Sequence, residues 1–219
     1  MSNDENIFIE VFQDLILTSC DARHAVLREA LYRNATSPWR HAEESELALH
    51  KSTREYLAFQ RSPSDNIAAS SLTLRERTDG YEVMNIVPLE EQDLGISGYN
   101  DVLNDFIERI VNPAAQELKL GITLTPRKQS ITDWVSSEAA STLHTFSACA
   151  NKSTGADHPM DRERWFKFIS AAYDTNSRFS TYLLGRWLVE AEKWPPETAA
   201  DLVDSYQYSM DLLESRAVA

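Results

Sequence analysis

Residues 71–87 read Ser-Leu-Thr-Leu-Arg-Glu-Arg-Thr-Asp-Gly-Tyr-Glu-Val-Met-Asn-Ile-Val and carry the clearest structural signal in the chain. Two strand-like segments, 71–77 and 81–87, are joined by Thr78-Asp79-Gly80. An Asp-Gly pair adopts the positive φ angles of a tight hairpin turn at low steric cost. The stretch therefore predicts an antiparallel β-hairpin with one buried face.

The sequence after the hairpin predicts a helix and a third strand. From Tyr99 to Leu118 apolar residues recur at helical spacing, and we expect Pro113 to kink or split this helix. Gly121-Ile-Thr-Leu-Thr125 then has the character of a strand. We therefore expect an α+β fold, in which a small, mostly antiparallel sheet is flanked by N-terminal and C-terminal helices. The hairpin and a third strand after the crossing helix form that sheet.

Both flanks show helical periodicity. On the N-terminal side, the spacing of apolar residues predicts two helices within 6–33 and a third over 41–60. Ser37-Pro38 is expected to end the second of these, because proline disfavours a helical conformation in the residue before it. Residues 61–66 read either as a linker or as a surface loop.

The C-terminal side predicts four more helices. Their expected ranges are 136–150, from Pro159 onward, 180–192 and 196–215. The length favours a single domain over residues 1–219. A subdivision is conceivable, and its parts would be an N-terminal helical segment, the β-β-α-β unit and a C-terminal helical segment (1–62, 63–128 and 129–219).

The net charge of −13 is concentrated in the middle of the sequence. Between Arg61 and Leu118, eleven acidic residues face only four arginines, whereas Lys119 to His158 is slightly basic. Phosphate neutralisation needs clustered Lys and Arg, so nucleic-acid binding is not expected. The acidic region is interpreted either as an ordinary solvated surface or as a docking face for a basic partner.

Cysteine content and hydropathy indicate the compartment. Cys20 and Cys149 are too few and too isolated for a disulfide framework or a zinc site, and we expect no metal and no cofactor. The acidic N-terminus does not resemble a signal peptide, and no apolar run approaches the length of a membrane span. These observations predict a cytoplasmic protein without a membrane segment.

Residues 150–165 hold the densest group of functional side chains. A set of cationic, hydroxyl and backbone groups there could bind an anion between two helices, because free N–H groups and the helix dipole favour negative charge. The candidate anion-binding residues are Lys152, Ser153, Thr154, Gly155, Arg162 and Arg164. In the alternative, structural interpretation, Gly155 ends one helix and Asp157 or His158 caps the next.

Within this stretch, His158 is the candidate catalytic acid or base, with Asp157 beside it as an orienting carboxylate. A nucleophile elbow of the G-x-S-x-G type is absent, and the spacing of a phosphate-binding Walker loop is absent as well.

Two classes of function follow. The favoured hypothesis is a non-catalytic protein-interaction module, such as an accessory subunit, an antitoxin or an immunity-type partner. It would bind a basic protein through the sheet edge or the helix from Tyr99 to Leu118. The alternative is an enzyme or small-anion-binding protein that uses residues 151–164. A homo-oligomer is compatible with either hypothesis.

Overall fold

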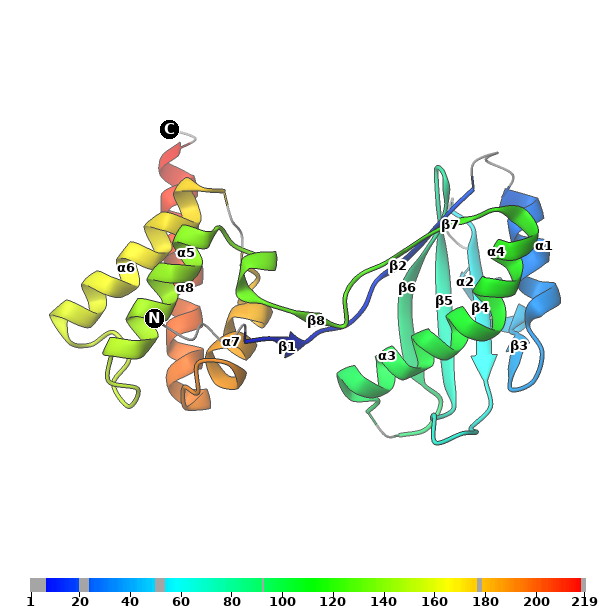
Figure 1. Cartoon of the computed structure of the whole chain (residues 1–219), viewed down its shortest axis with the longest axis horizontal. Coiled ribbons are helices and arrows are strands. Elements are labelled where there is room, and N and C mark those ends of the chain that lie inside the picture. Colours follow the sequence, from blue (N-terminus) through cyan, green and yellow to red (C-terminus); the bar gives the residue numbers. More distant parts are fainter. Residues whose placement is uncertain (1–6, 20–23, 50–53, 92, 177–178, 218–219) are drawn as a thin grey trace. The chain divides into compact units, whose positions relative to one another are not determined.

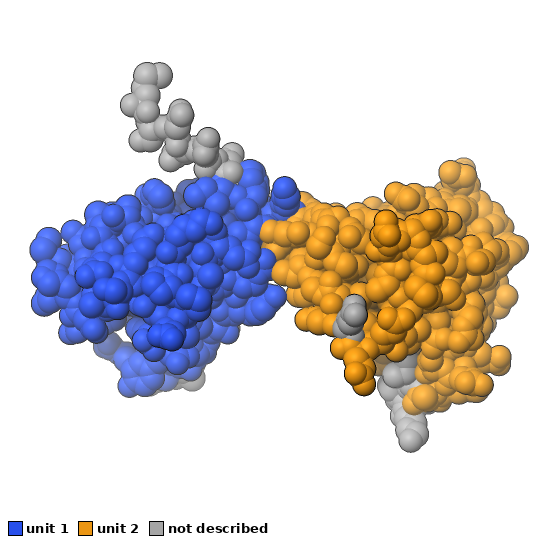
Figure 2. Space-filling view, turned by 90° about the horizontal axis from the view of Figure 1, so that it is seen from below, with its two compact units in different colours: residues 1–9, 128–219 blue, residues 10–127 orange. Residues whose placement is uncertain are grey.

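The computed structural model describes residues 7–19, 24–49, 54–91, 93–176 and 179–217. The chain forms two compact units, which Figure 2 shows in different colours. Unit 2 consists of residues 10–127, and unit 1 consists of residues 1–9 together with 128–219. The prediction of a single domain stays a prediction.

Unit 2 is built on a six-stranded antiparallel sheet (Figure 1). Its spatial order is β3-β4-β5-β6-β2-β7. The strands are β2 (Leu15–Thr18), β3 (Trp39–His41), β4 (Tyr56–Arg61), β5 (Ser70–Arg77), β6 (Gly80–Pro88) and β7 (Gly121–Leu124). The predicted α+β class, with a mostly antiparallel sheet and helices beside it, is confirmed.

Helices pack on one face of this sheet (Figure 1). They are α1 (His24–Asn34), α3 (Gly95–Phe106), the π-helical segment η1 (Ile107–Val111) and α4 (Asn112–Leu118). One core joins the sheet to these helices, and its fully buried members include Leu17, Leu31, Phe59, Leu72 and Phe106. Burying such side chains stabilises a fold by roughly 1.5–3 kcal/mol each.

The predicted hairpin, third strand and crossing helix are confirmed. Strands β5 and β6 pair in register around the turn, with Arg77 opposite Gly80. The predicted helix over 99–118 is interrupted by η1, where the N–H of Asn112 reaches back to the carbonyl of Ile107. Pro113 follows directly, in the first turn of α4. Because proline has no N–H, it is tolerated at a helix start, and the chain splits the helix there.

The helices predicted for the N-terminal part are largely wrong. Among the described residues of 6–33 only α1 is helical, and the first half contains β1 (Ile9–Glu10) and β2 instead. Among those of 41–60 the structure has α2 (Glu43–Leu49) and then β4, while residues 50–53 of the predicted helix lie outside the described part. Short apolar runs fit a strand as well as a helix, and pairing with distant strands decides between them. Leu17 lies beside Tyr81 and Ile122, which are far away in sequence.

The suggested linker at 61–66 is an ordered loop that folds around a buried arginine. The Arg61 side chain is fully buried and pairs with Asp105 at 2.8 Å. Its Nη1 donates to the carbonyls of Ser62 and Ile67, at 3.0 and 2.9 Å. Its Nη2 donates to Ser64 Oγ at 3.1 Å. The guanidinium therefore fixes this loop against the sheet, and residues 10–62 share one core with 63–127.

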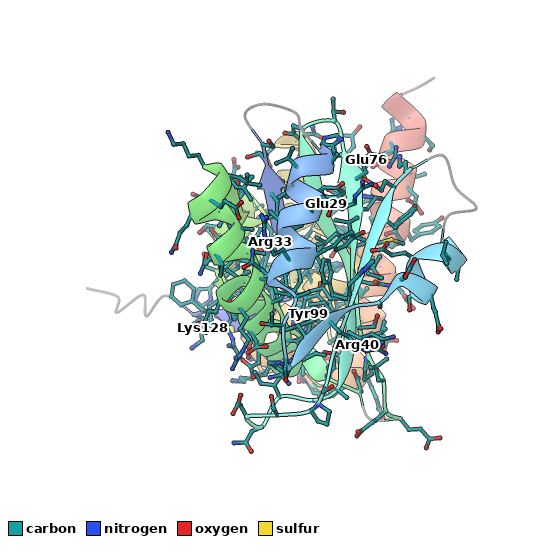
Figure 3. The ribbon with its side chains drawn as sticks, turned by 90° about the vertical axis from the view of Figure 1, so that its right-hand side faces the viewer. Glu29, Arg33, Arg40, Glu76, Tyr99 and Lys128 are labelled. Carbon is teal, nitrogen blue, oxygen red and sulfur yellow. The ribbon has the colours of Figure 1, made fainter. Side chains whose placement is uncertain are left out.

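Ion pairs link α1 to its surroundings. Glu29 and Arg33 follow one another along this helix in Figure 3, with Glu76 of β5 near its beginning. His24 Nδ1 lies 3.0 Å from Glu76 Oε1. Arg33 reaches Glu117 of α4 at 2.7 Å.

Unit 1 is helical in the part that the structure describes. After β8 (Lys128–Gln129) come the short 3-10 helix η2 (Ile131–Asp133) and four helices. These are α5 (Ser137–Cys149), α6 (Pro159–Asp174), α7 (Thr181–Glu190) and α8 (Pro196–Ala217), as predicted to within two residues. Their core is aromatic, with Phe146 stacked on Trp194 at 5.2 Å between ring centroids. No helix among the described residues is long and apolar enough to cross a membrane.

Candidate docking groove

The predicted site at 150–165 lies in unit 1, and the structure brings only part of its residues together. Lys152 extends to the segment between α7 and α8, where it donates to the carbonyl of Glu192 and lies 5.8 Å from the centroid of the Trp194 ring. Arg164 pairs with Asp161 at 2.6 Å. Both cations therefore contact neighbouring residues of unit 1 and stabilise its structure locally.

Other members of the set line a surface hollow of about 300 Å³ between the 153–157 turn, α6 and α8. Ser153, Thr154, Gly155, Asp157 and Arg162 contribute to it, whereas Lys152, His158 and Arg164 do not. Asp201 of α8 adds a second carboxylate to the lining. The hollow thus has one cation against two carboxylates, which disfavours an anion.

Arg162 itself stabilises the loop. Its Nε donates to the carbonyl of Ala156 at 3.3 Å, and a terminal nitrogen donates to that of Asp157 at 3.2 Å. Gly155 is buried in the same turn with φ +62°, and a Cβ there would approach the Thr198 side chain to 3.2 Å. Gly155 does not end α5, which stops at Cys149. It permits the turn to pack closely on α8.

His158 acts as the helix cap that the structural interpretation allowed. It is the N-cap of α6, and its Nδ1 accepts the N–H of Met160 at 3.3 Å. Pro159 follows in the first turn of α6, where a missing N–H costs nothing. Nδ1 is engaged in capping, and no hydrogen bond within the described residues links the His158 ring to Asp157. The geometry gives no assembled acid–base pair.

A different concave surface lies on unit 2, where the end of β6 meets the start of α3. We call it the docking groove, and its volume is about 290 Å³. Its lining is mainly apolar and comprises Phe12, Met84, Ile86, Pro88, Leu94 and Tyr99, with Asp93 and Gly95 at one end. Phe12 and Met84 remain 42% and 50% exposed, so the groove presents large apolar side chains to solvent.

Phe12 is held in place by a buried amide. Asn100 of α3 is fully buried, donates to the carbonyl of Val11 at 2.8 Å and accepts the N–H of Gln13 at 2.9 Å. The backbone on both sides of Phe12 is thereby fixed. Its ring meets Tyr99 edge to face, with 5.0 Å between the centroids. Such a pair is a rigid aromatic surface that needs little reordering on binding.

Met84 reaches the groove because β6 contains an extra residue. Thr73 pairs with Asn85 and Leu74 pairs with Val83, so Met84 bulges out of the ladder. A bulge redirects a side chain without breaking the sheet. On the other wall, Gly95 adopts φ +59°, and its N–H donates to Asp93 Oδ1 at 3.0 Å. This turn leads the chain into α3 and places Leu94 and Tyr99.

Tyr99 has a perturbed hydroxyl. Burial, followed by the nearby charge of Asp14, raises the pKa of Tyr99 to about 12. The phenol is therefore neutral at physiological pH and can donate or accept a hydrogen bond at the groove. Tyr99 lies at the start of the contact helix that the sequence predicted, whereas Phe12 was not among the predicted contact residues, because the spacing of its neighbours predicted a helix there. No sequence signal marked Asn100.

Most acidic residues of the central region contact a basic side chain within unit 2. Seven of the eleven carboxylates between Arg61 and Leu118 pair with arginine or histidine, namely Asp65, Glu76, Asp79, Glu82, Asp101, Asp105 and Glu117. In the part of the chain that the structure describes, no such pair forms at Glu90, Glu91, Asp93 or Glu108. Three of these four lie together in the loop beside the docking groove.

Asp105 shows how thoroughly such charges are satisfied. Burial alone would raise its pKa, but hydrogen bonds from Arg61, Arg109 and Trp39 outweigh this effect and lower the pKa of Asp105 below its ordinary value. The carboxylate is thus a structural element, not a surface charge. The residual negative potential of the region lies mainly at the 90–93 loop.

Neither comparisons nor metal geometry add a known function. No family model matches the chain, and no curated protein or solved structure matches it either. Among the described residues, no three His, Cys, Asp or Glu side chains come together to hold a metal ion.

Proposed function

We propose that this chain is a non-catalytic protein-interaction module that binds a basic partner through the docking groove of unit 2. The observation that supports the proposal most is the coincidence of exposed apolar side chains with unpaired carboxylates. Phe12, Met84 and Tyr99 line the groove, and Glu90 and Glu91 lie in the adjoining loop. The proposal refines the favoured sequence hypothesis, because Tyr99 begins the predicted contact helix.

The apolar part of the groove suits a side chain from a protein surface. Its volume lies at the lower end of the roughly 300–1,000 Å³ that small-molecule sites occupy, and its lining has few convergent polar groups. Aromatic residues and methionine are enriched at protein interfaces. Met84 can also adapt its shape to the partner, because its side chain is unbranched and flexible.

The charged part defines the partner. Residues 10–127 carry 19 acidic and 12 basic side chains, and the rest of the chain carries 15 and 9, so net charge does not distinguish the units. Within the central region, Glu90, Glu91 and Asp93 lie close together in sequence and form no pair with arginine or histidine among the described residues, so their charge is uncompensated. A partner segment with a large apolar side chain flanked by Lys or Arg would be complementary to both features.

The alternative enzymatic or anion-binding function is less well supported. It requires Lys152, His158 and Arg164 in one place, and each of them has a separate structural contact. We therefore do not propose it.

A charge-reversal experiment tests the proposal. The full-length protein is immobilised, and bound proteins from an extract of its source cells are identified by mass spectrometry. Glu90→Lys/Glu91→Lys should abolish retention of the specific partner, and Met84→Asp should do the same without changing the sign of the loop. The matched control is Glu43→Lys/Glu44→Lys, which reverses two consecutive exposed carboxylates on α2.

The control variant should retain the partner, and the captured protein should contain a basic segment. Higher salt should weaken the interaction, because exposed charges are screened over about 10 Å at 0.1 M ionic strength. Equal losses in both double variants would show a nonspecific charge effect. Undiminished binding by the Glu90→Lys/Glu91→Lys protein would refute the groove as the docking site.

A further inference from the structure

The two edges of the unit 2 sheet differ in how they are protected. At one edge, β3 is followed by α2, and Glu46 of that helix accepts the N–H of Ala58 at 2.7 Å. This carboxylate satisfies a backbone group that would otherwise face outward. At the other edge, β7 has no strand on its outer side in the described structure, and all four of its residues are exposed.

The outward backbone groups of β7 can be identified from its pairing. The N–H of Thr125 donates to the carbonyl of Asp14 at 3.0 Å, so Thr125 bonds toward β2. Thr123, two residues earlier in the chain, lies opposite Ile16 of β2. In an antiparallel ladder, residues alternate between bonding toward one neighbour and toward the other. Ile122 and Leu124 lie between the bonded positions, so their N–H and C=O groups point away from β2 to the open edge.

In most proteins a lysine, a proline or a β-bulge keeps an open edge strand from pairing with another chain. The sequence of β7, Gly-Ile-Thr-Leu, contains none of these. Ile122 and Leu124 are opposite Leu17 and Leu15 in the register, so their side chains lie on the helix-covered face of the sheet. Each is 37% exposed, which leaves apolar surface directly beside the open backbone.

We propose that this edge pairs with the same edge of a second copy of the chain. With Thr123 on a two-fold axis, Ile122 lies opposite Leu124 of the second copy, and Leu124 lies opposite Ile122. These two are the residues whose backbone groups point outward, so each pair exchanges both hydrogen bonds. The edge is therefore complementary to itself, as a two-fold interface requires.

Side chains in this register are also compatible. Ile122 and Leu124 form apolar cross-strand pairs on one face, and the two Thr123 side chains meet on the other. Lys119 would lie near Arg127 of the second copy. Arg127 is already neutralised, at 2.6 Å from Glu10 and 2.8 Å from Asp101. The result is a homodimer with one continuous sheet, and it depends on residues separate from the docking groove.

Sedimentation of the full-length chain tests the inference. Its average mass should rise from 24.9 kDa toward twice that value as concentration increases. Among backbone hydrogen-bonding groups, Ile122→Pro removes only the outward N–H of residue 122, and proline is tolerated at such edge positions. The variant should keep its fold, judged by circular dichroism. It should weaken dimerisation at least about tenfold, because two symmetry-related hydrogen bonds are lost.

Cysteine cross-linking tests the register, in a background where Cys20 and Cys149 are replaced by serine. Thr123→Cys should form a disulfide-linked dimer, because residues opposite each other in a non-bonded pair have Cα atoms about 4.5 Å apart. Ile122→Cys is the matched control and should not, since its copies would lie about 7–8 Å apart on the diagonal. A chain that stays monomeric at all concentrations would overturn the proposal, and so would a dimer that Ile122→Pro leaves intact.

Discussion

Replacement of Asp105 by alanine should destabilise unit 2 severely. The carboxylate accepts hydrogen bonds from Arg61 at 2.8 Å, Trp39 at 2.7 Å and Arg109 at 2.7 Å. Its removal leaves the fully buried Arg61 guanidinium without a counter-charge and the Trp39 indole N–H without an acceptor. Breaking a buried pair in this way costs about 3–5 kcal/mol.

Hydrogen exchange measures this loss in the intact chain. Amides of β4 and β5 should exchange about two to four orders of magnitude faster in Asp105→Ala, because each 1.4 kcal/mol corresponds to about a factor of ten. Amides of α5 and α6, in unit 1, provide an internal reference. Glu117→Ala is the matched control, because its pair with Arg33 is exposed and contributes only about 0–1 kcal/mol.

The same residue predicts an acid dependence. The pKa of Asp105 in the folded protein lies below its ordinary value of 3.8, so the charged form stabilises the fold above that pH. The stabilisation is lost as the pH falls below 3.8 toward the folded-state pKa.

In Asp105→Ala, an increase of less than about tenfold in the amide exchange rates of β4 and β5 would refute the reasoning. It would mean that Arg61 finds other partners or reaches water when the carboxylate is gone.

Two further predictions concern single polar groups. Ser147→Ala should destabilise unit 1 by about 1–3 kcal/mol in denaturant unfolding. The substitution leaves the buried indole N–H of Trp194 without its acceptor, Ser147 Oγ, which lies 2.9 Å away. Ser141→Ala, at an exposed position, is the control and should have little effect. The difference in ultraviolet absorbance between the wild type and Tyr99→Phe should titrate near pH 12, and a midpoint near 10 would contradict the burial of this phenol at the groove. Since its folded pKa is raised, the stability that neutral Tyr99 contributes is present below pH 10 and is lost as the pH rises toward 12.

The two candidate sites differ in how local their residues are in the sequence. Cations and hydroxyls are dense in the 150–165 stretch. In three dimensions Lys152, Arg162 and Arg164 each stabilise a different local contact. The docking groove combines Phe12 with side chains from Met84 to Tyr99, which are separated from Phe12 by about a third of the chain or more. No window of sequence contains both.

The sequence alone determined the elements whose stabilising interactions are local. The hairpin at 71–87 follows from its Asp-Gly turn, and the helices of unit 1 follow from apolar periodicity and from caps such as Ser136 and His158. Those signals lie within a few residues of the structure that they specify. For this reason they were read correctly without knowledge of the rest of the chain.

Only the tertiary structure decided the N-terminal strands and the state of the charges. Leu15–Thr18 is too short for periodicity to identify, and it becomes a strand because β6 and β7 supply hydrogen-bonding partners on both sides. The acidic residues likewise look equivalent in sequence. Folding brings arginines to Asp105 and Glu82 but not to Glu90, because ion pairing depends on distance in space and not on spacing along the chain.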